Sequence, residues 1–153
     1  MPETPESLAA SVVQPPALDV ECVALALGEQ FALQGDLTPL ISERDQNFRL
    51  ASPQGQFVVK VVSRADSSEL VDFQVSALKH LEQQEFGRVP RVVDTVSGGS
   101  LGVIEDSDGQ AYVLRVVTWV AGEMRDNAAL NESAAHSFGE GIAEFGAAMQ
   151  GFR

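Results

Sequence analysis

A single cation inside a run of valines constrains this fold more than any other feature of the sequence. Lys60 lies in the segment F-V-V-K-V-V at positions 57–62, with two valines on each side. β-Branched residues favour strands, so we expect this segment to form one. A lysine buried there is costly unless an anion meets it. The sequence therefore predicts a sheet strand whose lysine binds an anionic partner.

The residues before this strand predict a hairpin that follows a polar loop. The loop S-E-R-D-Q-N occupies positions 42–47, and we expect a strand over residues 48–51. The sequence S-P-Q-G at 52–55 is typical of a tight turn into the lysine strand. The polar loop and Lys60 should therefore lie close together.

The rest of the chain alternates between helical and extended patterns. Apolar residues at helical spacing predict one helix over residues 18–33 and a long second helix over residues 67–84. Pro39 marks residues 37–41 as an edge strand between them. The remaining elements are strand candidates at 91–96, 101–105 and 111–120, and a helix that begins near Asn131.

These elements predict an α+β fold. We expect a five-stranded, mostly antiparallel sheet with one long helix packed on it and helices at both ends. Prolines and small polar residues indicate a flexible leader over residues 1–17, and the folded unit should span residues 18–122. Residues 123–153 should hold a polar linker, at 123–127, and the last helix.

Charge and hydropathy narrow the partners. The formal net charge is −12, from 22 acidic and 10 basic residues, which argues against a nucleic-acid partner. No apolar run approaches the ~20 residues of a membrane span, and the N-terminus lacks the features of a signal peptide. We therefore expect a cytoplasmic protein without a membrane partner. Any phosphate ligand would be held by local backbone N–H groups and a few chosen cations.

The order of these elements resembles the nucleotide-binding lobe of protein-kinase-like phosphotransferases, in particular the aminoglycoside phosphotransferase and choline kinase group. The phrase L-I-S-E-R-D-Q-N-F-R-L at 40–50 is similar to the hydroxylysine kinase proteins and to phosphotransferase domains fused to class III aminotransferases. The phrase Y-V-L-R-V-V-T-W-V-A-G-E at 112–123 resembles the segment that leads from a strand into the hinge of the same group. The resemblance extends from about Leu18 to the end of the chain.

The resemblance implies a nucleotide site. Lys60 would position the phosphates of ATP or GTP, and the Mg²⁺ ligands would lie in a larger C-terminal lobe. The hinge at Trp119 and Val120 would offer backbone groups to the base. The loop would cover the phosphates through its backbone N–H groups and the side chains of Ser42, Arg44, Gln46 and Asn47.

Each of these residues also has a purely structural interpretation. Lys60 could lie on an edge strand and extend along the valines to place its ammonium group in solvent. The loop could be a solvated turn, in which Arg44 pairs with a neighbouring acid. Trp119 could be ordinary core packing at the end of the sheet.

One residue departs from the pattern. Kinase-like lobes pair the strand lysine with a glutamate on the long helix, and Gln74 occupies that position here. A glutamine can accept a hydrogen bond from Lys60 but leaves its charge uncompensated, so Gln74 joins the nucleotide-site residues in a changed role. Asp72 is the alternative partner for Lys60.

The resemblance implies the small lobe of a small-molecule kinase, which phosphorylates a hydroxyl of an amino-acid, amino-alcohol or aminoglycoside-like substrate. No H-x-D-x-x-x-x-N pattern follows Gly122, so we expect no catalytic residue in this chain and no phosphoryl transfer by it alone. The alternative is a non-catalytic α+β interaction module with the shape of such a lobe. We also expect the last helix to fold back, to dock on the larger lobe or to form a homodimer. Its apolar stripe consists of Phe138, Ile142, Phe145 and Met149.

Overall fold

The structure is a computed structural model that describes residues 15–122 and 131–153. Most of the expected leader and the whole expected linker at 123–127 therefore lie outside the described residues. Within them, no helix is long and apolar enough to cross a membrane. The described helices are α1 (Val20–Phe31), α2 (Ser68–Gln83) and α3 (Glu132–Ala148). The described strands are β1 (Asp36–Leu40), β2 (Gln46–Ser52), β3 (Gly55–Val61), β4 (Gly102–Glu105) and β5 (Ala111–Thr118).

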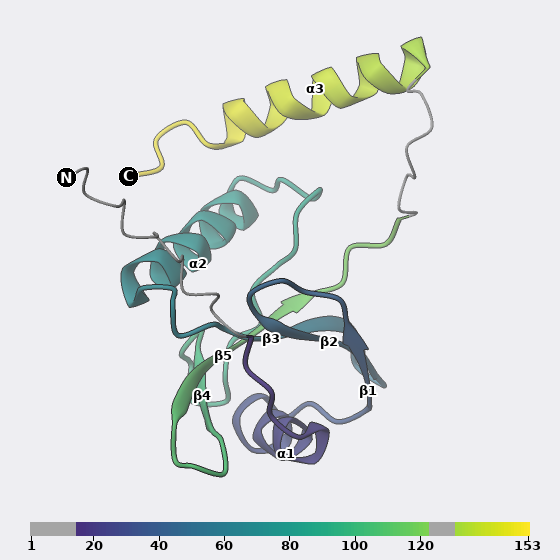
Figure 1. Ribbon diagram of the computed structural model, residues 1–153. Coiled ribbons are helices and arrows are strands. Elements are labelled where there is room, and N and C mark those ends of the chain that lie inside the picture. The colour runs from purple at the N-terminus through teal and green to yellow at the C-terminus, as the bar shows by residue number, and fades with distance from the viewer. Residues whose placement is uncertain (1–14, 123–130) are drawn as a thin grey trace, which may run out of the picture.

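The strands form one antiparallel sheet in the order β1-β2-β3-β5-β4 (Figure 1). The first three strands follow one another as a meander, with the β2–β3 turn closed between Ser52 and Gly55. β5 is inserted between β3 and β4, so the strand that leads to the predicted hinge is the direct neighbour of the lysine strand. The predicted α+β fold with a five-stranded antiparallel sheet is confirmed.

The predicted strand at 91–96 is wrong. Val92 makes only an isolated bridge to Val117 of β5, beyond the end of β4. The chain then leaves the sheet at Thr95, whose backbone N–H donates to the Gly99 carbonyl at 2.7 Å while its hydroxyl accepts from the Gly99 N–H at 3.0 Å. Because this turn uses the polar groups of Thr95 locally, the segment cannot continue its ladder with β5.

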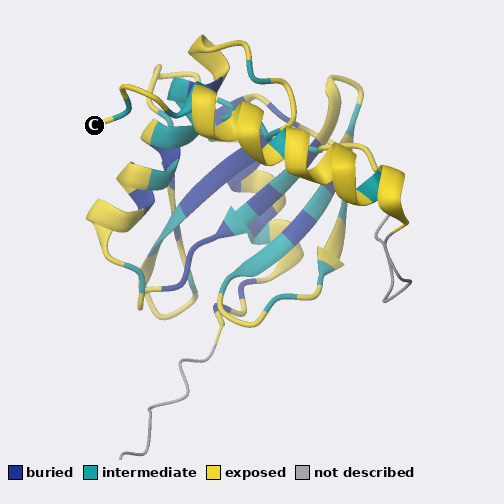
Figure 2. Cartoon of the chain, turned by 90° about the horizontal axis from the view of Figure 1, so that it is seen from above, coloured by how far each residue is buried: buried dark blue, intermediate teal, exposed yellow. Residues whose placement is uncertain are grey.

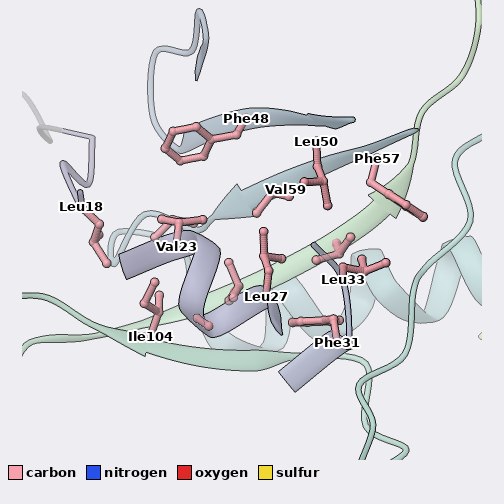
Figure 3. Close-up of a cluster of buried hydrophobic side chains, with 14 residues drawn as sticks. Leu18, Val23, Leu27, Phe31, Leu33, Phe48, Leu50, Phe57, Val59 and Ile104 are labelled. Atoms are coloured by element: carbon pink, nitrogen blue, oxygen red, sulfur yellow. The ribbon is translucent and has the colours of Figure 1, made fainter. Parts of the chain in front are cut away.

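α1 covers one face of the sheet and contributes Val23, Ala26, Leu27 and Phe31 to the main core (Figure 3). Phe48 and Leu27 are each 1% exposed and lie at its centre. Full burial of a side chain of this size stabilises the fold by roughly 1.5–3 kcal/mol. The core members that Figure 3 labels are Leu18, Val23, Leu27, Phe31, Leu33, Phe48, Leu50, Phe57, Val59 and Ile104.

α2 and α3 lie on the opposite side of the sheet from α1 (Figure 1). α2 begins at Ser67, whose hydroxyl accepts from the Leu70 N–H at 3.2 Å. An N-cap of this kind is worth about 1 kcal/mol. The buried residues of α2 are Val71, Val75 and Leu81.

α3 folds back toward α2 at its C-terminal end. The ring of Phe145 packs edge-on against Phe86 with centroids 5.8 Å apart, and Phe152, beyond the helix, packs against Phe73 at 5.4 Å. Most of α3 is exposed, as Figure 2 shows, and in its N-terminal half Phe138 is 65% exposed. The predicted fold-back therefore applies to one end of this helix, and the homodimer stays a prediction.

Candidate functional site

Three polar residues lie side by side on the sheet face opposite α1. Asn47 of β2 pairs in register with Lys60 of β3, which pairs with Arg115 of β5. We call these three residues the polar row. Side chains alternate between the two faces of a strand, and the apolar neighbours of the polar row on each strand are buried in the α1 core. The row therefore lies on the face that α2 shares.

Lys60 forms an ion pair with a carboxylate of the preceding loop. Its Nζ lies 3.2 Å from Oδ2 of Asp45, and the two side chains are 26% and 15% exposed. The other carboxylate oxygen, Oδ1, accepts a hydrogen bond from the Ser63 N–H at 3.0 Å. Asp45 is thus bound by two partners from β3 and the residues just after it.

Gln74 contacts Arg115 rather than Lys60. Nη1 of Arg115 donates to the Gln74 side-chain oxygen at 2.8 Å. The pairing of Lys60 with Gln74 or Asp72 that the sequence suggested is therefore wrong. The physical reason is that Arg115 binds the amide of Gln74, while the loop brings Asp45 to the end of β3.

Arg115 is a buried cation, with 6% of its surface exposed. Burial lowers the pKa of its guanidinium, and the carboxylates of Asp45 and Asp66 oppose that shift. An arginine remains protonated in proteins even with a lowered pKa. The polar row therefore holds two positive charges on adjacent strands.

The structure separates the loop residues that the sequence grouped together. Arg44 pairs with Asp66, which is the structural alternative considered for it. Gln46 belongs to β2, and its side-chain amide makes two hydrogen bonds of 2.8 Å with the backbone of Leu18, on the α1 side. Ser42 is half-buried in the loop. Asn47 is the loop candidate that joins Lys60 in the polar row.

The site has unused hydrogen-bonding capacity. Among the described residues, Oδ1 of Asn47 and Nε of Arg115 are buried atoms without a hydrogen-bond partner. They belong to the two residues that flank Lys60 in the polar row. Leaving such an atom unsatisfied costs about 1–3 kcal/mol, so both are candidates to contact a ligand or an ordered water.

The site also has a local excess of positive charge. Arg44, Lys60 and Arg115 provide three cations, and their acidic neighbours are Asp45 and Asp66. These three cations outnumber the two carboxylates that face them, in a chain with a net charge of −12. A region of this sign in an acidic chain favours a small anionic ligand.

Trp119 continues the line of β5 beyond its last residue. Its backbone N–H donates to the Gln56 carbonyl at 2.9 Å, and the guanidinium of Arg49 lies 4.5 Å from the centre of its ring. Arg49 also donates to the Gln56 side chain from Nε at 3.1 Å. Trp119 is half-buried beneath this cation, and Val120 after it is exposed. Sequence reasoning missed Arg49. It lies two residues after Asn47 in β2, so the two side chains are on the same face of the sheet.

No cluster of metal-ligating side chains is present among residues 15–122 and 131–153. Nowhere among them do three histidine, cysteine, aspartate or glutamate side chains gather in a way that could hold a metal ion. Asp45 and Asp66, the acids of the polar site, each pair with a cation.

Comparison with known proteins places this geometry in a family. Residues 36–153 match the phosphotransferase enzyme family (APH), a range that runs from β1 to the end of the chain. No curated protein matches the chain. The solved structure of amicoumacin kinase hAmiN, in complex with AMP-PNP, Ca²⁺ and Ami, matches 88% of this chain with a TM-score of 0.74 and 18% sequence identity. This chain spans 41% of the length of that kinase, and at such an identity the likeness is one of fold.

Proposed function

The chain belongs to the phosphotransferase enzyme family, and from that premise we propose that it is the nucleotide-binding small lobe of a small-molecule kinase. The observation that carries the proposal is the polar row, in which Lys60 lies between two residues with unsatisfied buried atoms. A positioned ammonium group offsets the charge of a nucleotide's phosphates. The ligand is ATP or GTP.

In this proposal each part of the site has its own contact. Lys60 binds phosphate oxygens, and Nε of Arg115 donates to a phosphate oxygen or to a water beside it. The loop residues Ser42 and Arg44 lie over the phosphates. Trp119 and Val120 contact the base, and the hydrogen bonds come from the Trp119 carbonyl and the backbone groups of Val120, since the Trp119 N–H already binds Gln56. Gln46 is left out, because both ends of its amide bind Leu18 on the other face.

The proposal also covers the metal ion and the acceptor substrate, which would bind mainly to residues outside the described ones. The divalent ion would be Mg²⁺ bound between the phosphates and carboxylates outside the described residues, since Asp45 and Asp66 already pair with cations. The acceptor would be a hydroxyl of an amino acid, an amino alcohol or an aminoglycoside-like compound. That choice rests on the similarity of residues 40–50 to hydroxylysine kinase proteins and to domains fused to class III aminotransferases.

Nucleotide titration tests the proposal. ATP and GTP analogues with fluorescent ribose labels should bind this chain in the presence of Mg²⁺, and Lys60→Ala should weaken binding by about tenfold to a hundredfold. The reason is the loss of a charge-assisted contact to phosphate.

The matched control is Lys79→Ala, because Lys79 pairs with Asp94 at 2.8 Å and is not a member of the polar row. Its nucleotide affinity should equal that of the unaltered chain. If neither nucleotide binds the unaltered chain, the non-catalytic interaction module becomes the better explanation. Equal affinities of the two lysine variants would remove Lys60 from the site.

A further inference from the structure

The charge partner of Lys60 comes from an unexpected element. The position on the long helix that should supply it holds Gln74, which is neutral and bound to Arg115 at 2.8 Å. Asp72, the nearby helix acid, is exposed. The carboxylate at 3.2 Å from Lys60 Nζ belongs instead to Asp45 of the loop between β1 and β2.

We propose that Asp45 is the positioning residue for Lys60, and that this loop, rather than α2, holds the lysine in its nucleotide-binding orientation. This inference rests on the proposed function, since it names the residue that prepares Lys60 for phosphate. Asp45 acts through Lys60 and need not touch the nucleotide itself.

The anchoring of Asp45 identifies it as an orienting group rather than a competitor that phosphate displaces. Oδ1 is held by the Ser63 N–H at 3.0 Å, and Ser63 is 2% exposed. If Asp45 left, this buried N–H would lose its partner. A lysine ammonium has several N–H donors, so Lys60 can keep Asp45 and still donate to phosphate oxygens.

A second contact holds the same loop in the same place. Arg44, the residue before Asp45, pairs with Asp66 in the connection between β3 and α2. Two adjacent loop residues are therefore tied to the segment that follows the lysine strand. The position of the loop and the orientation of Lys60 are coupled by these contacts, and none of them is made by a residue of α2.

A double-mutant cycle tests this coupling. Asp45→Asn keeps an oxygen acceptor for the Ser63 N–H but removes the charge that faces Lys60. We expect it to weaken nucleotide binding roughly tenfold in the unaltered chain and to have almost no effect in the Lys60→Ala background. Asp72→Asn, which changes an exposed acid of α2, should leave nucleotide affinity nearly unchanged.

The opposite results would overturn the inference. Tighter binding by Asp45→Asn would mean that Asp45 competes with phosphate, and an equal loss in both backgrounds would mean that it does not act through Lys60. A loss for Asp72→Asn as large as that for Asp45→Asn would return the positioning role to α2.

A measurement without nucleotide separates this inference from the proposed function. The rate at which an acylating reagent modifies each lysine can be followed by mass spectrometry. Asp45→Asn should speed the modification of Lys60 several-fold, because the ammonium group loses its carboxylate partner, and should leave Lys79 unchanged. An unchanged rate at Lys60 sinks the positioning role, even if nucleotide binding is confirmed. A faster rate supports the role, even if neither nucleotide binds.

Discussion

Phe48→Ala should lower the free energy of unfolding by about 3–5 kcal/mol, the largest loss that we expect from one substitution in this chain. Phe48 is 1% exposed and packs in the core between β2 and α1. Truncation would remove buried apolar surface and leave a cavity, because a packed sheet and helix collapse only in part around such a gap. Urea denaturation, followed by circular dichroism, would report the change as a lower midpoint at an unchanged slope.

The matched control is Phe138→Ala on the open half of α3. Phe138 is 65% exposed, so the same change of side chain should alter the unfolding free energy by no more than about 0.5 kcal/mol. A small loss for Phe48→Ala, comparable with that of the control, would contradict the core arrangement. The result also bears on the site, because Phe48 follows Asn47 in β2 and holds that strand against α1.

The alternation of side chains along the strands could be predicted from sequence. In F-V-V-K-V-V at 57–62, any strand that buries Phe57, Val59 and Val61 must place Lys60 on the other face. The turn signals around the hairpin then determine which residues of β2 lie opposite it. The five-stranded sheet and the lysine strand were therefore accessible before the structure was known.

Arg115 shows a signal that was present in the sequence and not used. It lies in V-L-R-V-V, a cation between apolar pairs like Lys60 in its own strand. The rule that identified Lys60 applies equally to Arg115, and would have predicted two buried cations. Register then brings them together, because β5 pairs with β3 although the long helix lies between them in the chain.

The choice of ion-pair partner could not be read from sequence. Asp45, Asp72 and Gln74 are all candidates, because each is near Lys60 in the sequence or corresponds to the position of its partner in the family pattern. The decision depends on where the loop between β1 and β2 crosses the end of β3, and on Arg115 binding Gln74. Both are contacts between elements that are distant in sequence, so local patterns do not encode them.

The role of Gln46 could not be predicted either, because it depends on where the loop ends and β2 begins. Its polarity favoured the loop, but it is the first residue of β2 and lies on the α1 face, where it binds the backbone of Leu18. A polar residue that satisfies backbone groups looks the same in sequence as one that is free to bind a ligand.

Gly35→Ala should lower the free energy of unfolding by about 3 kcal/mol, from backbone strain and steric overlap together. Gly35 precedes β1 with φ 157°, and a Cβ atom there would lie 2.8 Å from the carbonyl carbon of Ala51 and 2.9 Å from Cα of Ser52. Both contacts are with the backbone of β2, which cannot move aside like a flexible side chain. The measurement is again the urea midpoint, with hydrogen exchange of the amides of β1 and β2 to locate the damage.

Gly28→Ala provides a control of opposite sign. Gly28 lies inside α1, and nothing within 4 Å would meet an added Cβ. Because alanine favours the helix over glycine, this substitution should raise the unfolding free energy by up to about 1 kcal/mol. If Gly28→Ala raises the unfolding free energy and Gly35→Ala lowers it, the loss at Gly35 is due to the close approach of β2 and not to alanine itself. If Gly35→Ala were harmless, the pairing of β1 with β2 would be looser than described, and Asp45, in the loop between them, would lose one of the supports of its position beside Lys60.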